Sequence, residues 1–98
     1  MDAELLRALR AVIDPELGLD VVSLGLVYAA ERDGDRARVE LTLTSPACPL
    51  GEGMVADARA ALESLVPGVR QAEVELVFEP RWGPERMSPE ARATLGVP

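Results

Sequence analysis

The chain has 98 residues, 48% of them hydrophobic, which predicts a single domain over residues 1–98 with one modest core. Its 17 acidic and 10 basic residues give a formal net charge of -7. A surface of that sign repels phosphate backbones and anionic lipid, so we expect no nucleic-acid partner and no membrane partner.

The start of the chain and its cysteine content predict a cytoplasmic protein. The first 20 residues carry several acidic side chains and lack the basic and apolar regions of a signal peptide. No apolar run approaches the length of a membrane span. One cysteine cannot form an intramolecular disulfide, which fits a reducing compartment.

The first predicted element is an amphipathic helix that Asp2 caps and that ends before Pro15. Proline pushes the preceding residue, Asp14, away from helical angles. The apolar stripe of this helix comprises Leu5, Leu6, Leu9, Val12 and Ile13. A loop is predicted over residues 16–25.

A β-hairpin follows this loop. Its strands are predicted at residues 26–31 and 37–44, on either side of Asp33-Gly34-Asp35, because an Asp-Gly pair accepts positive φ at low cost. The residues of the second strand expected to face the core are Val39, Leu41 and Leu43. Thr42 and Thr44 are expected on its other, exposed face.

The second half of the chain predicts a long helix, a strand and a short helix. The long helix spans residues 49–66, and its apolar stripe comprises Leu50, Met54, Ala58, Leu62 and Leu65. The strand spans residues 69–79, and the residues expected on one of its faces are Ala72, Val74, Leu76 and Phe78. Ser88 is expected to cap the short helix at its start and Gly96 at its end.

This order of helix, hairpin, helix, strand and short helix predicts a two-layer α/β (α+β) sandwich. A small mixed sheet would carry the helices on one face. If the third strand runs parallel to the second, the long helix is the right-handed crossover between them.

Cys48 is the first candidate for chemistry. Just before a helix, free backbone N–H groups and the helix dipole favour a thiolate. The alternative is a small buried side chain that never reacts. A catalytic thiol usually needs a histidine base, and the sequence contains none. Because a cluster needs about four ligands, any metal bound through Cys48 must be shared with a second copy of the chain or with a client.

Three further groups are candidates. Asp14 and Glu16, held in a loop by the proline between them, could supply oxygen ligands or a general base; the alternative is a helix end with solvated charges. Thr42 and Thr44 could line a groove beside Cys48. The remaining group is Arg81-Trp82, in a loop framed by proline and glycine; such residues either pack over the edge of the core or anchor an interface.

Three segments resemble one known family, the SufT-like and PaaD-like auxiliary proteins of iron–sulfur cluster assembly. They are DPELGLDVVSLGLVY, LTLTSPACPL and FEPRWGPERMSPEARATLG, in that order along the chain. The resemblance implies a compact α/β domain like that of iron–sulfur scaffold proteins. It carries the family's site over to Asp14, Glu16, Thr44 and Cys48, with Thr42 beside them. The chain lacks the cysteine-bearing C-terminal extension of PaaD-type members, so the short SufT-like branch fits better.

The sequence therefore predicts an auxiliary factor, not an enzyme. It would assist cluster delivery to client apo-proteins by docking and by transient thiolate and carboxylate contact, alongside other assembly components. No cofactor would be bound permanently, although iron or an iron–sulfur cluster would bind transiently, and a homodimer is one way to complete the ligands. Two alternatives remain: an interaction adaptor in which Cys48 is structural, and a small enzyme that uses Asp14, Glu16 and Cys48.

Overall fold

The secondary-structure elements follow the predicted order. The computed structural model describes residues 1–44 and 51–97. In chain order the elements are α1 (Ala3–Leu9), β1 (Val27–Asp33), β2 (Arg36–Leu41), α2 (Gly51–Leu65), β3 (Gln71–Leu76), the 3₁₀ turn η1 (Pro84–Arg86) and α3 (Pro89–Leu95). The predicted α+β architecture is confirmed. Among the described residues, no helix is long and apolar enough to cross a membrane.

β2 is the central strand of the sheet, which in the described residues has the order β1-β2-β3. β1 pairs antiparallel with β2, and β3 runs parallel to β2, so the sheet is mixed as predicted. Asp33 pairs with Arg36, which leaves Gly34 and Asp35 as the turn residues. Gly34 has φ 62°, whereas Asp35 has no positive φ, a pattern typical of a type II′ hairpin turn.

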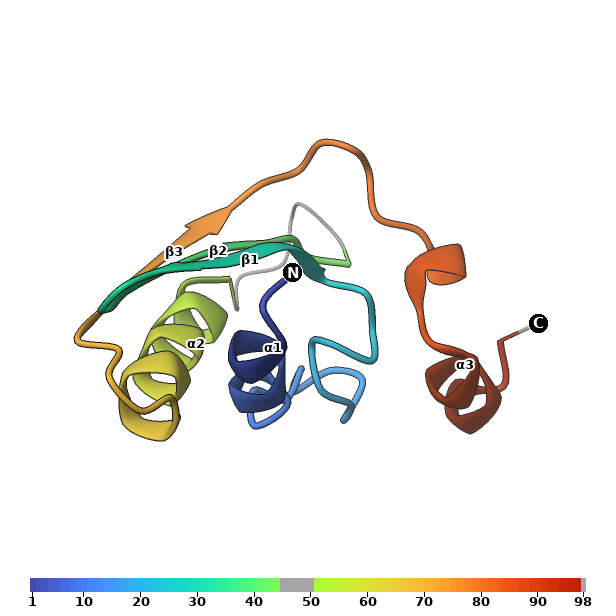
Figure 1. Ribbon diagram of the computed structural model, residues 1–98. Helices are drawn as coiled ribbons and strands as arrows, with labels where there is room; N and C mark the ends of the chain where they lie inside the picture. Colours follow the sequence, from blue (N-terminus) through green and yellow to red (C-terminus); the bar gives the residue numbers. More distant parts are fainter. Residues whose placement is uncertain (45–50, 98) are drawn as a thin grey trace.

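Two helices cover one face of the sheet. Figure 1 shows α1 and α2 beneath the strands and α3 apart from them, beyond the loop that precedes β1. The aliphatic side chains that are fully buried here include Leu5, Leu9, Leu24, Leu26, Leu41, Leu62, Val12, Val21 and Val39. Each such side chain contributes roughly 1.5–3 kcal/mol by leaving water, so this layer drives folding.

Both core-facing helices differ from the prediction near their C-terminal ends. α1 stops before Ile13, which is 48% exposed instead of lying on the apolar stripe. Ile13 pairs with Asp20 in an isolated bridge that closes the following loop. Leu65 of α2 is 56% exposed, because burial continues at intervals of four residues to Val66. Leu50, the predicted start of that stripe, lies outside the described residues.

The two parallel strands end earlier than predicted. β2 ends at Leu41 and β3 at Leu76, and beyond these residues the chain leaves the sheet. Alternation of faces therefore no longer applies. Thr42, predicted to be exposed, is 1% exposed, and Phe78, predicted on the same strand face as Ala72, is 41% exposed whereas Ala72 is 4% exposed.

α3 has both predicted caps. The Oγ of Ser88 accepts a hydrogen bond from the Ala91 N–H at 3.1 Å, and Gly96 has φ 70° at the C-cap. The Ser88 N–H donates to the Ser23 carbonyl at 2.8 Å, which ties α3 to the loop before β1.

A close backbone contact joins the same loop to η1. Gly25 has φ 74°, and a Cβ built on it would overlap the carbonyl group of Arg86. Glycine is therefore required here both for its backbone angle and for the space that it leaves.

We expect Gly25→Ala to lower stability more than Gly34→Ala does. Both residues have positive φ, which costs alanine about 1–2 kcal/mol, but no atom lies within 4 Å of a Cβ built on Gly34. The free energy of unfolding is measured by urea titration. The extra amount that Gly25→Ala loses relative to Gly34→Ala reports the contact with Arg86. Equal losses for the two variants would contradict this close packing.

Candidate functional site

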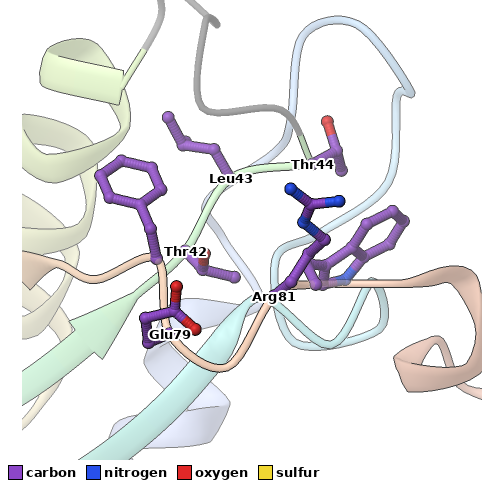
Figure 2. Close-up of a pocket in the computed structure, with 7 residues that line it drawn as sticks. Thr42, Leu43, Thr44, Glu79 and Arg81 are labelled. Atoms are coloured by element: carbon purple, nitrogen blue, oxygen red, sulfur yellow. The ribbon is translucent and has the colours of Figure 1, made fainter.

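A pocket of about 400 Å³ opens where β2 and β3 end. Figure 2 shows the described side chains that line it. They are Thr42, Leu43, Thr44, Phe78, Glu79, Arg81 and Trp82. Its volume is near the lower end of the range for small-molecule sites, about 300–1,000 Å³.

The position of the pocket follows from the parallel pairing of β2 with β3. Leu41 and Leu76 are partners in the last pair of the ladder, so both strands end at the same edge of the sheet. The Val77 N–H still donates to the Leu41 carbonyl at 2.8 Å, and the two chains separate after this bond. The residues that follow become opposite walls of the pocket. Carboxyl ends of neighbouring parallel strands are a common place for binding sites.

The second wall is an extended segment, residues 77–83, which we call the C-terminal strap. It leads from β3 to η1 and α3 (Figure 1). The Tyr28 hydroxyl donates to the Pro80 carbonyl at 2.8 Å. The Trp82 Nε1–H donates to the Leu24 carbonyl, also at 2.8 Å, and the Trp82 ring packs against the core. Trp82 is thus both an anchor of the strap and a wall of the pocket.

η1 adds a third attachment between the C-terminal part of the chain and β1. The Arg86 guanidinium carbon lies 4.7 Å from the centre of the Tyr28 ring, within the range of a cation–π contact. Tyr28 therefore uses its hydroxyl for the strap and its ring for η1.

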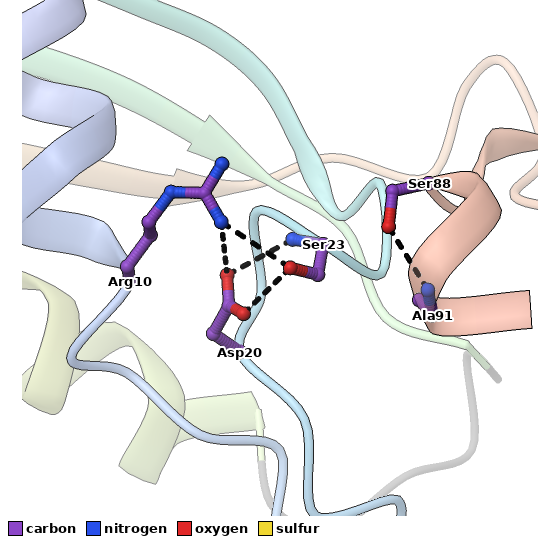
Figure 3. Close-up of polar contacts among 5 residues, drawn as sticks. All are labelled: Arg10, Asp20, Ser23, Ser88 and Ala91. Carbon is purple, nitrogen blue, oxygen red and sulfur yellow. Dashed lines mark hydrogen bonds and ion pairs between the residues drawn. The ribbon is translucent and has the colours of Figure 1, made fainter. Parts of the chain in front are cut away.

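A polar network stiffens the loop that receives the strap (Figure 3). The Asp20 carboxylate accepts hydrogen bonds from the Ser23 N–H at 2.9 Å and from the Ser23 hydroxyl at 2.7 Å. Arg10 Nη1 lies 3.8 Å from an Asp20 carboxylate oxygen and donates to the Ser23 hydroxyl at 3.3 Å. This network fixes the turn from which Leu24 offers its carbonyl to Trp82.

The Asp14-Pro15-Glu16 turn is held by its own first carboxylate. Asp14 is 5% exposed, and its Oδ1 accepts the N–H groups of Glu16 at 2.8 Å and Leu17 at 3.2 Å. Glu16 is exposed. Neither Asp14 nor Glu16 is among the described residues that line the pocket.

The structure brings together four of the predicted site residues. Thr42 and Thr44 of one predicted group meet Arg81 and Trp82 of another in the pocket. Cys48 lies outside the described residues. Within the described part of the chain, no three His, Cys, Asp or Glu side chains are close enough to hold a metal ion together.

Sequence reasoning missed Leu43, Phe78 and Glu79 as pocket residues. Leu43 was assigned only to the core, Phe78 to a strand face, and Glu79 to no site. The parallel register holds the missing signal: if Leu41 and Leu76 are aligned, the residues two or three positions beyond each must face one another.

The pocket contains one charge of each sign, and both side chains are exposed at its edge. Among the described residues, the Arg81 guanidinium forms no hydrogen bond or ion pair, and neither does the Glu79 carboxylate. The two charges are therefore available to a ligand.

Comparison with known proteins gives consistent matches. Residues 2–76 match the family model described as iron-sulfur cluster assembly protein. The chain is 43% identical over 94 residues to the Fe-S protein maturation auxiliary factor YitW of Bacillus subtilis, covering 95% of this chain and 91% of that protein. It is 52% identical over 75 residues to an iron-sulfur cluster carrier protein of Deinococcus radiodurans, covering 76% of this chain and 21% of that longer protein.

A solved structure agrees with the fold. The crystal structure of a domain of unknown function, DUF59, from Bacillus anthracis matches with a TM-score of 0.90 and 44% identity, over 96% of this chain and 90% of that one. Because the family model covers most of the chain and relatives of similar length share over 40% of their residues, the chain belongs to the iron–sulfur cluster assembly protein family, as the resemblance of its three motifs predicts.

Proposed function

We propose that this chain is an auxiliary factor that helps deliver iron–sulfur clusters to client proteins and has no enzymatic turnover of its own. Relatives of similar length are named Fe-S protein maturation auxiliary factors, and a longer one is named an iron-sulfur cluster carrier protein. Delivery is a ligand exchange: a thiolate of this chain holds iron or a cluster until the ligands of the client replace it. The cluster is cargo, not a resident cofactor.

The observation that carries this proposal is that the chain's one cysteine follows a pocket residue closely in the sequence. Thr44, a pocket residue, lies four residues before Cys48 in the sequence, and α2 begins at Gly51, three residues after it. Four residues span at most about 14 Å of extended chain, which is the reason for proposing that the thiol acts near this pocket. Thiolates are the usual ligands of iron–sulfur clusters.

The division of roles within the predicted site follows from the contacts of Asp14. Its Oδ1 already accepts two backbone N–H groups, so we assign Asp14 to shaping the turn that carries Glu16. Cys48 is the proposed ligand, and Thr42 and Thr44 belong to the wall of the pocket. One thiol cannot complete a cluster site, so a second copy of the chain or the client supplies the other ligands.

Anaerobic reconstitution with iron and sulfide tests the ligand role of Cys48. The wild-type chain should develop sulfur-to-iron charge-transfer absorption, whereas Cys48→Ser should lose it, because a hydroxyl does not replace the thiolate. Ser64→Ala, at the far end of α2, is the control and should behave like wild type.

Oligomer mass, measured on the same samples, shows whether two copies share the cargo. Equal iron binding by wild type and Cys48→Ser would contradict ligation by this residue. No iron in either protein would favour the adaptor alternative, in which Cys48 is structural.

We propose that clients dock at the rim of the pocket, near Phe78, Arg81 and Trp82. Phe78 is 41% exposed, and aromatic and arginine side chains are the usual anchors of protein interfaces. Phe78→Ser should therefore weaken client binding by about tenfold or more. The measurement is the activity of iron–sulfur enzymes in cells that carry Phe78→Ser in place of the wild-type chain, compared with cells that carry a control variant.

Leu65→Ser is the matched control, because Leu65 is another exposed large side chain and lies at the end of α2, away from the pocket. Thermal melts should show both variants folded. An equal loss of iron–sulfur enzyme activity in both variants would refute docking at the rim.

A further inference from the structure

Two opposite charges lie in one pocket without pairing with each other. Glu79 and Arg81 are separated by one residue on the C-terminal strap, and no ion pair joins them. In Figure 2 the Arg81 side chain extends toward Thr44, whereas the Glu79 carboxylate lies beside Thr42. A ligand between them would meet a cation at one end and an anion at the other.

The rest of the pocket suits a small amphiphilic ligand. Thr42 and Thr44 belong to one wall, and Phe78 and Trp82 give the other an apolar, aromatic surface. The Trp82 ring is held in place because its Nε1–H donates to the Leu24 carbonyl. This part of the wall is therefore fixed before a ligand binds, which reduces the entropy lost on binding.

The geometry points to a binding site for a small zwitterionic amino acid or short peptide. Arg81 would bind the ligand's carboxylate through charge-assisted hydrogen bonds, and Glu79 would bind its ammonium group. The aromatic wall would contact its side chain. The volume of about 400 Å³ accommodates a free amino acid or a short peptide.

Among small zwitterionic amino acids and peptides, those with a thiol, such as cysteine or glutathione, could also bind the iron–sulfur cargo. This step rests on the proposed function. The chain contains one cysteine, whereas a cluster needs about four ligands. A small thiol held in the pocket would add one sulfur ligand to the cargo, and it would be displaced when the client binds.

A titration of the isotope-labelled, metal-free chain by NMR, under anaerobic and reducing conditions, tests the site. Addition of L-cysteine or glutathione should shift the signals of Thr44, Arg81 and the Trp82 indole N–H in a saturable way. An apparent Kd on the order of 1 mM is expected for an open, charged pocket. L-serine should bind like L-cysteine when no metal is present, because the charges recognise the backbone of the ligand.

The variants separate specific from general binding. Arg81→Gln and Glu79→Gln should each weaken binding of L-cysteine by about tenfold, because each removes one charge-assisted contact. Arg59→Gln, which removes an exposed arginine of α2, should leave it unchanged. N-acetylcysteine has no ammonium group, so it should bind more weakly and be insensitive to Glu79→Gln.

Three results would overturn the inference. They are NMR shifts in Arg81→Gln as large as those in the wild-type chain, shifts spread over the whole surface, and acetate binding as tight as that of L-cysteine. The titration contains no iron, so it can fail while Cys48-dependent reconstitution succeeds, and the reverse also holds. Failure of this inference and failure of the proposed function are therefore distinguishable.

Discussion

The parallel pairing of β2 with β3 is the constraint on which the site depends. A parallel pair needs a crossover, and α2 supplies it, so the segment that leaves β2 and the strap that leaves β3 start from the same edge of the sheet. An antiparallel third strand would have delivered the strap to the opposite edge. The threonines after β2 would then have no second wall, and Arg81 would lie at the other end of the molecule.

Among residues 1–44 and 51–97, the strap has no strand partner beyond Val77, so side chains hold it there. Tyr28 and Trp82 each supply one hydrogen bond, and an intramolecular hydrogen bond contributes only about 0.5–1.5 kcal/mol. The aromatic packing of Trp82 and the close contact between Gly25 and Arg86 therefore matter as much as the polar contacts. The shape of the pocket is set by residues more than fifty positions apart in the sequence.

Local signals predicted the elements and caps, whereas the pocket depended on distant contacts. Gly34 marked the hairpin, and Ser88 and Gly96 marked the ends of α3, because turns and caps depend on neighbouring residues. Thr42 was predicted exposed because alternation was continued past the true end of β2. The site residues were identified by side-chain type and by family resemblance, but the meeting of Thr44 with Arg81 depends on strand register, which no local pattern contains.

The low number of strong ligands fits a carrier better than a storage site. Asp14 uses its carboxylate to shape a turn, and the chain has one thiol, so on the proposed function its hold on a cluster is incomplete by itself. A protein with four cysteines would satisfy every position of a cluster and would have to break several bonds before release. A single thiolate leaves open positions that the client's cysteines can occupy first. Transfer can then proceed by stepwise replacement of ligands, and the cluster is never without partners.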